Sequence, residues 1–151
     1  MNIVLVEPEI PPNTGNVARL CAATNATLHL VGPLGFRLDD RALKRAGMDY
    51  WEHVVWKSWP SWGELHAQIP ASAQVFLVEN KTDRLYTDVQ YRAGDYLVFG
   101  RETTGLPTTL LDTYRDTTVA IPQFNPKARS LNLSNCVAIV LYEALRQVEG
   151  F

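Results

Sequence analysis

Short apolar segments alternate with amphipathic segments along this chain, and this alternation limits its fold more than any other feature. The short segments are apolar at successive positions, which is typical of strands buried on both faces. Such strands form parallel sheets with helices on both sides, because parallel neighbours need a crossover connection. We therefore predict a single α/β domain over residues 1–151, with a mostly parallel sheet covered by helices. The predicted strands are residues 2–7, 27–31, 53–57, 75–79, 96–100 and 119–122.

The last predicted helix has the clearest pattern. Apolar residues recur at i, i+4, i+7 and i+8 from Leu133 to Val148, which places them on one helix face. Asn132 or Ser134 is suited to cap the first turn of this helix. A short helix is also predicted over residues 108–113. Three earlier helices are predicted, and each has a polar residue that can cap it. Asn13 or Thr14 can cap a helix that includes Val17 and Cys21, Asp39 or Asp40 a short helix that ends at Gly47, and Ser61 a helix over residues 61–69.

The composition indicates a soluble globular protein: of 151 residues, 46% are hydrophobic and 20% are charged. The N-terminal segment has no basic region and only a short apolar run, so we expect no signal peptide. No stretch reaches the length of a membrane span, so we expect a cytoplasmic protein with no membrane partner. Cys21 and Cys136 lie in apolar helical patterns and are expected to be buried, reduced thiols.

The net charge of −2 differs from that of a strongly basic nucleic-acid-binding protein, but the charges are unevenly distributed. Four basic residues fall within nine positions: Arg37, Arg41, Lys44 and Arg45. They fit a local RNA-binding surface, and equally a solvated helix face balanced by Asp39, Asp40 and Asp49. Four tryptophans lie close together in the next segment, where they fit packing beneath a loop or stacking on RNA bases: Trp51, Trp56, Trp59 and Trp62.

Four unusual loops follow predicted strands. In open parallel sheets, ligands bind beyond the carboxyl ends of the strands. The loops at those ends read PEIPPNTGN, ENKT, GRETTGLP and PQFNPKARSLNLSN. Their glycines, amides and hydroxyls suit a neutral heterocycle or an amino-acid moiety bound largely through backbone groups. Helix capping and tight turns alone also account for each loop taken separately.

Several familiar sites are missing from these loops. No G-x-G-x-x-G follows the first strand, no Walker lysine motif occurs, and no G-x-S-x-G elbow is present. His29 and His53 are interpreted as strand residues and His66 as a residue on a helix surface. None of the three has metal-ligand spacing with a carboxylate or a cysteine, so the sequence predicts no metal site.

Three motifs in these loops carry a family resemblance. They are N-T-G-N-x-x-R (Asn13–Arg19), F-G-x-E-x-x-G-L-P (Phe99–Pro107) and I-P…R-S-L-N-L-S-N (Ile121–Asn135). In order and spacing they resemble the signature motifs of the SPOUT RNA methyltransferases. EPEIPPNTGN, RAGMDYW and SLNLSN…YEALRQ resemble the branch of that family that methylates the ribose 2′-oxygen at the tRNA wobble position. The resemblance covers essentially the whole chain.

The resemblance implies properties that spacing alone does not show. It implies a C-terminal trefoil knot, S-adenosylmethionine as cofactor, a homodimer, and the tRNA anticodon stem-loop as substrate. Carried over by position, the residues lining the cofactor pocket are Val78, Gly100, Ile121, Ser130 and Leu131. Arg19 lies at the implied catalytic centre, and Tyr142 contributes near it at the dimer interface or serves packing alone. Arg101 stands at a position that varies in the motif and is interpreted as an extra RNA contact.

The implied reaction is attack of the ribose 2′-oxygen of cytidine or uridine 34 on a sulfonium methyl. A dry pocket that aligns the two atoms contributes much of the rate, because charge is neutralised as the bond forms. A guanidinium is a poor base, so we expect Arg19 to orient a phosphate and stabilise the developing alkoxide. Two alternatives remain: a SPOUT enzyme acting on another RNA position, and a non-catalytic RNA-binding module.

Overall fold

The computed structural model describes residues 1–39, 41, 45 and 48–151, and these residues contain one six-stranded sheet. The strand order is β3-β2-β1-β5-β4-β6, and every neighbouring pair is parallel. An α/β fold built on a parallel sheet, as predicted, is therefore confirmed. The trefoil knot stays a prediction. The strands are β1 (Asn2–Val6), β2 (Thr27–Val31), β3 (Trp56–Trp59), β4 (Val75–Val78), β5 (Tyr96–Phe99) and β6 (Thr118–Val119).

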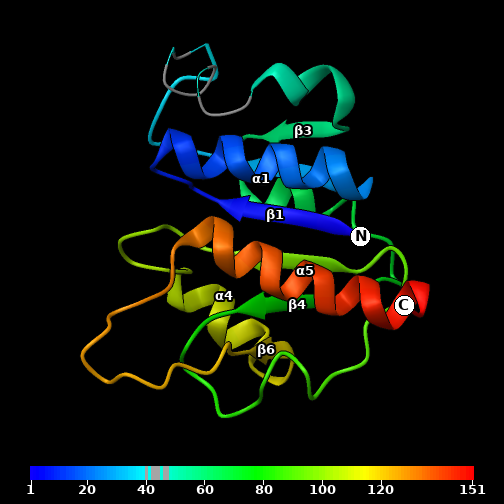
Figure 1. The fold of residues 1–151 in the computed structure, drawn as a ribbon, viewed down its shortest axis with the longest axis vertical. Helices are drawn as coiled ribbons and strands as arrows, with labels where there is room; N and C mark the ends of the chain where they lie inside the picture. Colours follow the sequence, from blue (N-terminus) through cyan, green and yellow to red (C-terminus); the bar gives the residue numbers. More distant parts are fainter. Residues whose placement is uncertain (40, 42–44, 46–47) are drawn as a thin grey trace.

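Helices cover both faces of the sheet. On one face α1 (Pro11–Thr24) and α5 (Leu133–Glu149) lie side by side (Figure 1). On the other face are the short helices α3 (Trp62–His66) and α4 (Thr108–Thr113). Two 3₁₀ helices, η1 (Met48–His53) and η2 (Arg115–Thr117), complete the described helices. The helix predicted to begin at Asp39 or Asp40 and end at Gly47 lies largely outside the described residues.

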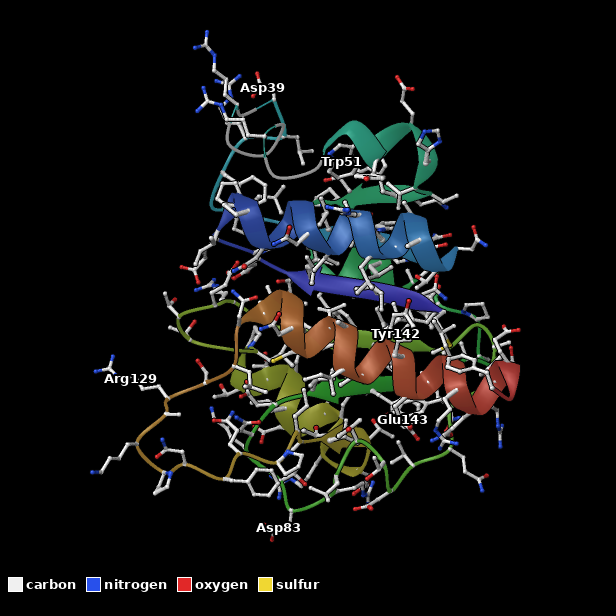
Figure 2. All side chains as sticks on the ribbon, viewed as in Figure 1. Asp39, Trp51, Asp83, Arg129, Tyr142 and Glu143 are labelled. Carbon is white, nitrogen blue, oxygen red and sulfur yellow. The ribbon has the colours of Figure 1, made fainter. Side chains whose placement is uncertain are left out.

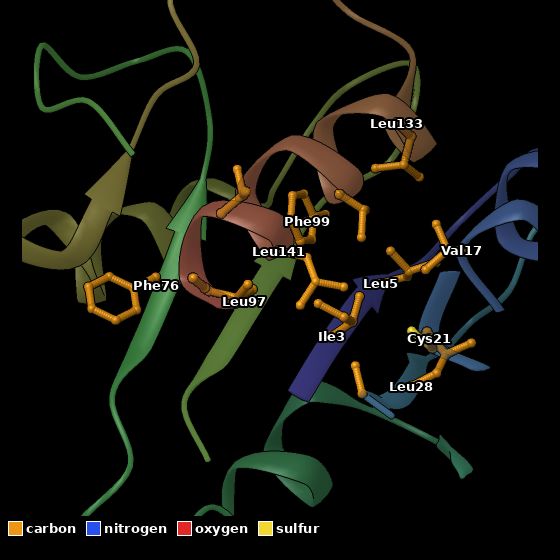
Figure 3. Packing of buried hydrophobic residues seen from close by; sticks show 14 of the residues in the cluster. Ile3, Leu5, Val17, Cys21, Leu28, Phe76, Leu97, Phe99, Leu133 and Leu141 are labelled. Atoms are coloured by element: carbon orange, nitrogen blue, oxygen red, sulfur yellow. The ribbon is translucent and has the colours of Figure 1, made fainter. Parts of the chain in front are cut away.

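The sheet divides the core into two layers, because successive strand side chains point to opposite faces. Ile3 and Leu5 of β1 face α1 and α5, whereas Val4 and Val6 face the side of α3 and α4. The layer under α1 and α5 is the larger one. Figure 3 shows part of its packing. Its fully buried side chains include Ile3, Leu5, Val17, Cys21, Leu28, Leu97, Phe99 and Leu141.

The first helix begins earlier than the sequence predicts. Asn13 and Thr14 are buried inside α1, and the N-cap position is Ile10, whose side chain makes no capping bond. Two prolines open the helix, and they supply a suitable φ while removing two N–H groups that would need acceptors. A local polar cap is therefore not required, and the prediction that Asn13 or Thr14 caps this helix is wrong.

The third strand is also displaced from its predicted position. The apolar pair Val54-Val55 suggested a strand over residues 53–57, but β3 runs from Trp56 to Trp59 and His53 ends a 3₁₀ helix. β3 lies at the sheet edge and is largely exposed, so it does not show the continuous apolar pattern of a buried strand. The apolar pattern instead marked Val54, which packs into the core.

The strand predicted over residues 119–122 is wrong in its bounds, because β6 covers only Thr118–Val119. The other predicted elements agree more closely with the structure. Ser61 caps α3 by accepting a hydrogen bond from the Glu64 N–H at 3.4 Å, and α4 occupies the predicted residues. The tryptophans pack mainly against their neighbours: Trp51 meets Trp56 edge to face at 4.4 Å between centroids, and Trp62 meets Tyr114. Both cysteines are free thiols. No described helix has the length and apolar character needed to cross a membrane.

Candidate functional site at the carboxyl ends of the strands

A cavity of about 720 Å³ opens at the carboxyl ends of β4 and β5, beside the segment that follows β6. All four loops singled out in the sequence contribute to its walls. This volume is in the usual range for cofactor and small-molecule sites. The cavity contains all five residues that the motifs assigned to a cofactor: Val78, Gly100, Ile121, Ser130 and Leu131. The structure thus brings together residues spread over more than fifty positions of the chain.

The floor of the cavity depends on a close approach of two backbone segments. A Cβ atom at Gly100 would collide with the backbone of Gly105 and Leu106, so no larger residue fits there. The segment turns back through two hydrogen bonds between Arg101 and Gly105, at 3.2 and 3.0 Å. Gly105 has a φ of 71°, a conformation that glycine adopts at little cost. The glycines of G-R-E-T-T-G therefore shape this wall.

Glu79 ties this turn to the end of β4. One oxygen of its carboxylate accepts a hydrogen bond from the Leu106 N–H, and the other accepts one from the Asn80 N–H, both at 3.1 Å. Glu79 lines the cavity, as do Glu102 and the apolar side chains of Val78 and Ile121. The cavity therefore combines apolar walls with two carboxylates.

A chain of three polar side chains connects the three motifs. The Glu102 carboxylate accepts hydrogen bonds from the Glu9 N–H at 2.8 Å and the Ile10 N–H at 3.0 Å. It also accepts one at 3.4 Å from the side-chain amide of Asn13, which is buried. The Asn13 carbonyl oxygen in turn accepts one at 2.9 Å from the side-chain amide of Asn132. Glu102, Asn13 and Asn132 thus align the start of α1, the loop after β5 and the start of α5.

Asn132 also caps α5, as one of the two sequence predictions proposed. Its side-chain oxygen accepts hydrogen bonds from the Ser134 N–H at 2.9 Å, the Ser134 hydroxyl at 2.6 Å and the Asn135 N–H at 3.4 Å. The side-chain oxygen of Asn132 therefore caps α5, and its side-chain NH2 group donates to Asn13 in α1. The residues just before it, Ser130 and Leu131, form part of the cavity wall.

Two further carboxylates join the loop after β1 to the loop after β5. Glu7 forms an ion pair with Arg101, and the Glu9 carboxylate accepts a hydrogen bond from the Thr103 hydroxyl at 2.7 Å. Arg101 was interpreted as an RNA contact, and the structure shows its guanidinium engaged with Glu7. These contacts place acidic side chains of the first loop against the second motif.

Cys136 lines the cavity at the start of α5. Burial, with a smaller contribution from the nearby Glu79 carboxylate, raises the pKa of its thiol to about 11. The thiol is therefore neutral at physiological pH and unsuited to act as a nucleophile. The described residues also hold no cluster of three His, Cys, Asp or Glu side chains that could bind a metal ion.

Arg19 and Tyr142, the two residues assigned to catalysis, do not line the cavity of their own chain. Arg19 is exposed on α1, with its guanidinium carbon 5.2 Å from the centre of the Tyr50 ring. Tyr142 is 47% exposed on the outer side of α5 (Figure 2). Both residues belong to the pair of helices that covers one face of the sheet.

Of the predicted RNA-binding residues, Arg37, Arg41 and Arg45 do not line the cavity. Arg37, Arg41 and Arg45 are exposed, and Arg37 pairs with Asp39 at 3.1 Å. Lys44 lies outside the described residues. The sequence reasoning assigned no role in the site to Glu79 or Glu102, and it gave Asn13 only a capping role in the first helix. Glu102 is the glutamate of the second motif, which was a signal in the sequence that it matters. Its hydrogen-bond partners could not be identified from the sequence, because they lie about ninety positions away.

Comparisons with known proteins agree with this arrangement. The family model described as the SpoU rRNA Methylase family matches residues 1–142. The chain belongs to the SpoU rRNA methylase family. It is 47% identical over 150 residues to a tRNA (cytidine(34)-2′-O)-methyltransferase of Escherichia coli K12, covering 98% of this chain and 94% of that protein. It is 48% identical to the protein of the same name from Burkholderia cenocepacia, covering 99% and 96%.

Solved structures of the SpoU family share the fold. One, described as giving structural insights into the 2-OH methylation of C/U34 on tRNA, matches with a TM-score of 0.93 and 44% identity, covering 99% of this chain and 97% of that chain. Another is the SpoU methyltransferase AviRb of Streptomyces viridochromogenes in complex with the cofactor AdoMet. It matches with a TM-score of 0.82 and 28% identity, covering 97% of this chain and 60% of that chain.

Proposed function

We propose that this protein is an S-adenosylmethionine-dependent tRNA 2′-O-methyltransferase that acts on the ribose of the wobble nucleotide, cytidine or uridine 34. The observation that carries the proposal is the cavity at the strand ends, which gathers all five residues expected to hold the cofactor. Relatives of nearly the same length and almost half-identical sequence bear the corresponding name. We further propose that residues 1–151 form one methyltransferase domain.

The walls of the cavity fit this cofactor. Val78, Ile121 and Leu131 offer apolar surface for an adenine ring, and Leu131 is 38% exposed at the wall. The close approach of Gly100 to the backbone of Gly105 and Leu106 fixes the shape of the wall against which the cofactor would lie. The lining also holds charged groups of both signs, the carboxylates of Glu79 and Glu102 and the guanidinium groups of Arg101 and Arg129, as suits a cofactor that carries a sulfonium, an ammonium and a carboxylate.

The chain's own residues then position the RNA. The cofactor supplies an electrophilic methyl group, and the 2′-oxygen must be held in line with it. We propose that Arg19 binds the phosphate next to that ribose and stabilises the developing alkoxide. Tyr50 supports this role, because its ring lies under the guanidinium and limits the conformations that Arg19 can adopt.

We also propose that two copies of the chain assemble through the face formed by α1 and α5. This face exposes Ile139 by 36% and Tyr142 by 47%, and it carries Arg19. Arg19 and Tyr142 lie outside the cavity of their own chain, so an interface here would let one copy complete the site of the other. Protomers carrying Arg19→Ala and Gly100→Ala should then restore activity when mixed, and no recovery would refute a shared site.

We propose that the basic segment containing Arg37, Arg41, Lys44 and Arg45 contacts the tRNA backbone, in a cytoplasmic enzyme. Reversing the charge of Arg41 and Arg45 together should weaken tRNA binding and reduce its salt dependence. A variant that binds tRNA as wild type does at every salt concentration would exclude this surface.

The central test has two stages. Calorimetry with S-adenosylmethionine measures binding, and mass mapping of nuclease digests then locates the methyl group on tRNA. Ribose methylation at nucleotide 34 would support the proposal. Methylation elsewhere would indicate another specificity, and cofactor or RNA binding without transfer would indicate a non-catalytic module. Arg19→Ala should abolish transfer while leaving cofactor affinity nearly unchanged, and unchanged turnover would exclude the role of Arg19.

A further inference from the structure

Phe124 is the most exposed large apolar side chain among the described residues, at 93%. Burying a phenylalanine stabilises a fold by roughly 1.5–3 kcal/mol, and the exposed Phe124 does not contribute this stabilisation. Single exposed apolar residues are common, so exposure alone decides nothing. The position of Phe124 is what distinguishes it.

Phe124 lies in the loop between β6 and α5, whose two ends form part of the cavity wall. Gln123, the residue before it, lines the cavity, as do Arg129 and Ser130 further along. Phe124 thus directly follows a residue of the cavity wall, in a loop that returns to that wall at Arg129.

The loop is held by a turn directly after Phe124. The side-chain oxygen of Asn125 accepts a hydrogen bond from the Lys127 N–H, and its backbone oxygen accepts one from the Ala128 N–H, both at 3.0 Å. Pro126 fixes the backbone between them. An aromatic ring presented from such a turn is partly pre-organised, which lowers the entropy cost of binding.

The neighbours of Phe124 along this loop are basic and polar. Lys127 and Arg129 are exposed in the same loop, and the Arg129 side chain extends from it into solvent (Figure 2). No aspartate or glutamate occurs from residue 117 to residue 142. An aromatic ring flanked by cations is typical of single-stranded nucleic-acid sites, where bases stack and phosphates meet the charges. The exposed polar neighbours argue against the apolar core of a protein interface.

We propose that Phe124 is a stacking platform for an unpaired base of the RNA substrate next to the methylated ribose, with Lys127 and Arg129 contacting the adjoining phosphates. This inference rests on the proposed function, because it names the RNA-binding element of that same site. The ring fixes the splayed nucleotide at the edge of the cavity.

Four variants of the full chain test the platform. Phe124→Ala and Phe124→Leu remove the aromatic face, and each should weaken binding of a synthetic anticodon stem-loop by roughly 5- to 150-fold. Phe124→Trp and Phe124→Tyr keep the face and should retain binding close to wild type. Phe151→Ala is the matched control, since Phe151 is also exposed, at 70%, near the chain end. Calorimetry with S-adenosylmethionine should give the same affinity for every variant.

Abasic substitutions in the stem-loop identify the stacked base. At one loop position, loss of the base should weaken binding to wild type but leave binding to Phe124→Ala unchanged, because the partner is already missing. If Phe124→Ala or Phe124→Leu binds the stem-loop as tightly as wild type does, the stacking platform is refuted. Methylation of tRNA by the wild type would still support the proposed function in that case. If the wild type fails to methylate tRNA, the proposed function itself fails, and this inference with it.

Discussion

Replacing Glu102 with alanine should destabilise the protein and impair methyl transfer, because this carboxylate connects the second motif to the start of α1. Both of its oxygens are used: one accepts from the Glu9 N–H at 2.8 Å, the other from the Ile10 N–H at 3.0 Å and the Asn13 amide at 3.4 Å. Bonds to a charged acceptor contribute roughly 1.5–3 kcal/mol each when buried, and less when water can replace them.

Water can reach the exposed Ile10 more readily than the half-buried Glu9 and the buried Asn13. We therefore expect Glu102→Ala to lower the free energy of unfolding by roughly 2 kcal/mol in total. For a chain of this size, such a loss lowers the melting temperature by roughly 4–8 °C. Urea denaturation at one fixed protein concentration measures the change, because assembly would otherwise shift it.

Two further variants make the experiment specific. Glu102→Gln keeps the shape but turns one acceptor into a donor that faces an N–H group, so it should recover at most half of the loss. Glu149→Ala removes an exposed carboxylate at the end of α5 and should change the free energy of unfolding by less than about 0.5 kcal/mol. We also expect Glu102→Ala to slow methyl transfer by roughly 10- to 100-fold, because α1 carries Arg19. A Glu102→Ala protein as stable as wild type, within about 0.5 kcal/mol, would refute this reasoning.

Three other perturbations give separate tests. Gly100→Ala should abolish S-adenosylmethionine binding in calorimetry, because the new Cβ would displace the backbone of Gly105; retained affinity would mean that the cavity is not the cofactor site. Burial, with a smaller contribution from the charge of Lys57, lowers the pKa of His29 to about 4, so the unfolded chain takes up this proton at a higher pH than the folded protein does. His29 should therefore contribute on the order of 3 kcal/mol to the free energy of unfolding above pH 6.5, and this contribution should be lost as the pH falls towards 4. His29→Gln should remove that part of the pH dependence, measured by urea denaturation. Lys127→Gln should reduce the slope of log Kd against log salt for a single-stranded RNA by about 0.7, and an unchanged slope would exclude a phosphate contact.

Local signals in the sequence determined much of the fold. The buried strands read as apolar runs, the final helix read as a strict 3.6-residue pattern, and Ser61 and Asn132 are caps whose partners lie within three residues. Because the strands are parallel, their carboxyl ends meet at one edge, and this placed the four loops around one cavity. The predictions for the start of α1 and the position of β3 were wrong. Prolines replace the usual polar cap at the start of α1, and β3 at the exposed sheet edge lacks the apolar pattern of a buried strand.

Only the tertiary structure decided how the motifs hold one another. Glu102 reaches Ile10 across 92 positions, and Asn132 reaches Asn13 across 119, because β1 lies beside β5 in the sheet and α1 lies beside α5. The sequence contains these residues as motif letters, but no local period or spacing encodes which of them will meet. Hydrogen bonds between distant segments depend on strand order and helix packing, which arise only when the whole chain buries its apolar surface. For the same reason the sequence showed KARSLNLSN as a polar helix start, and the fold made it part of a cavity wall.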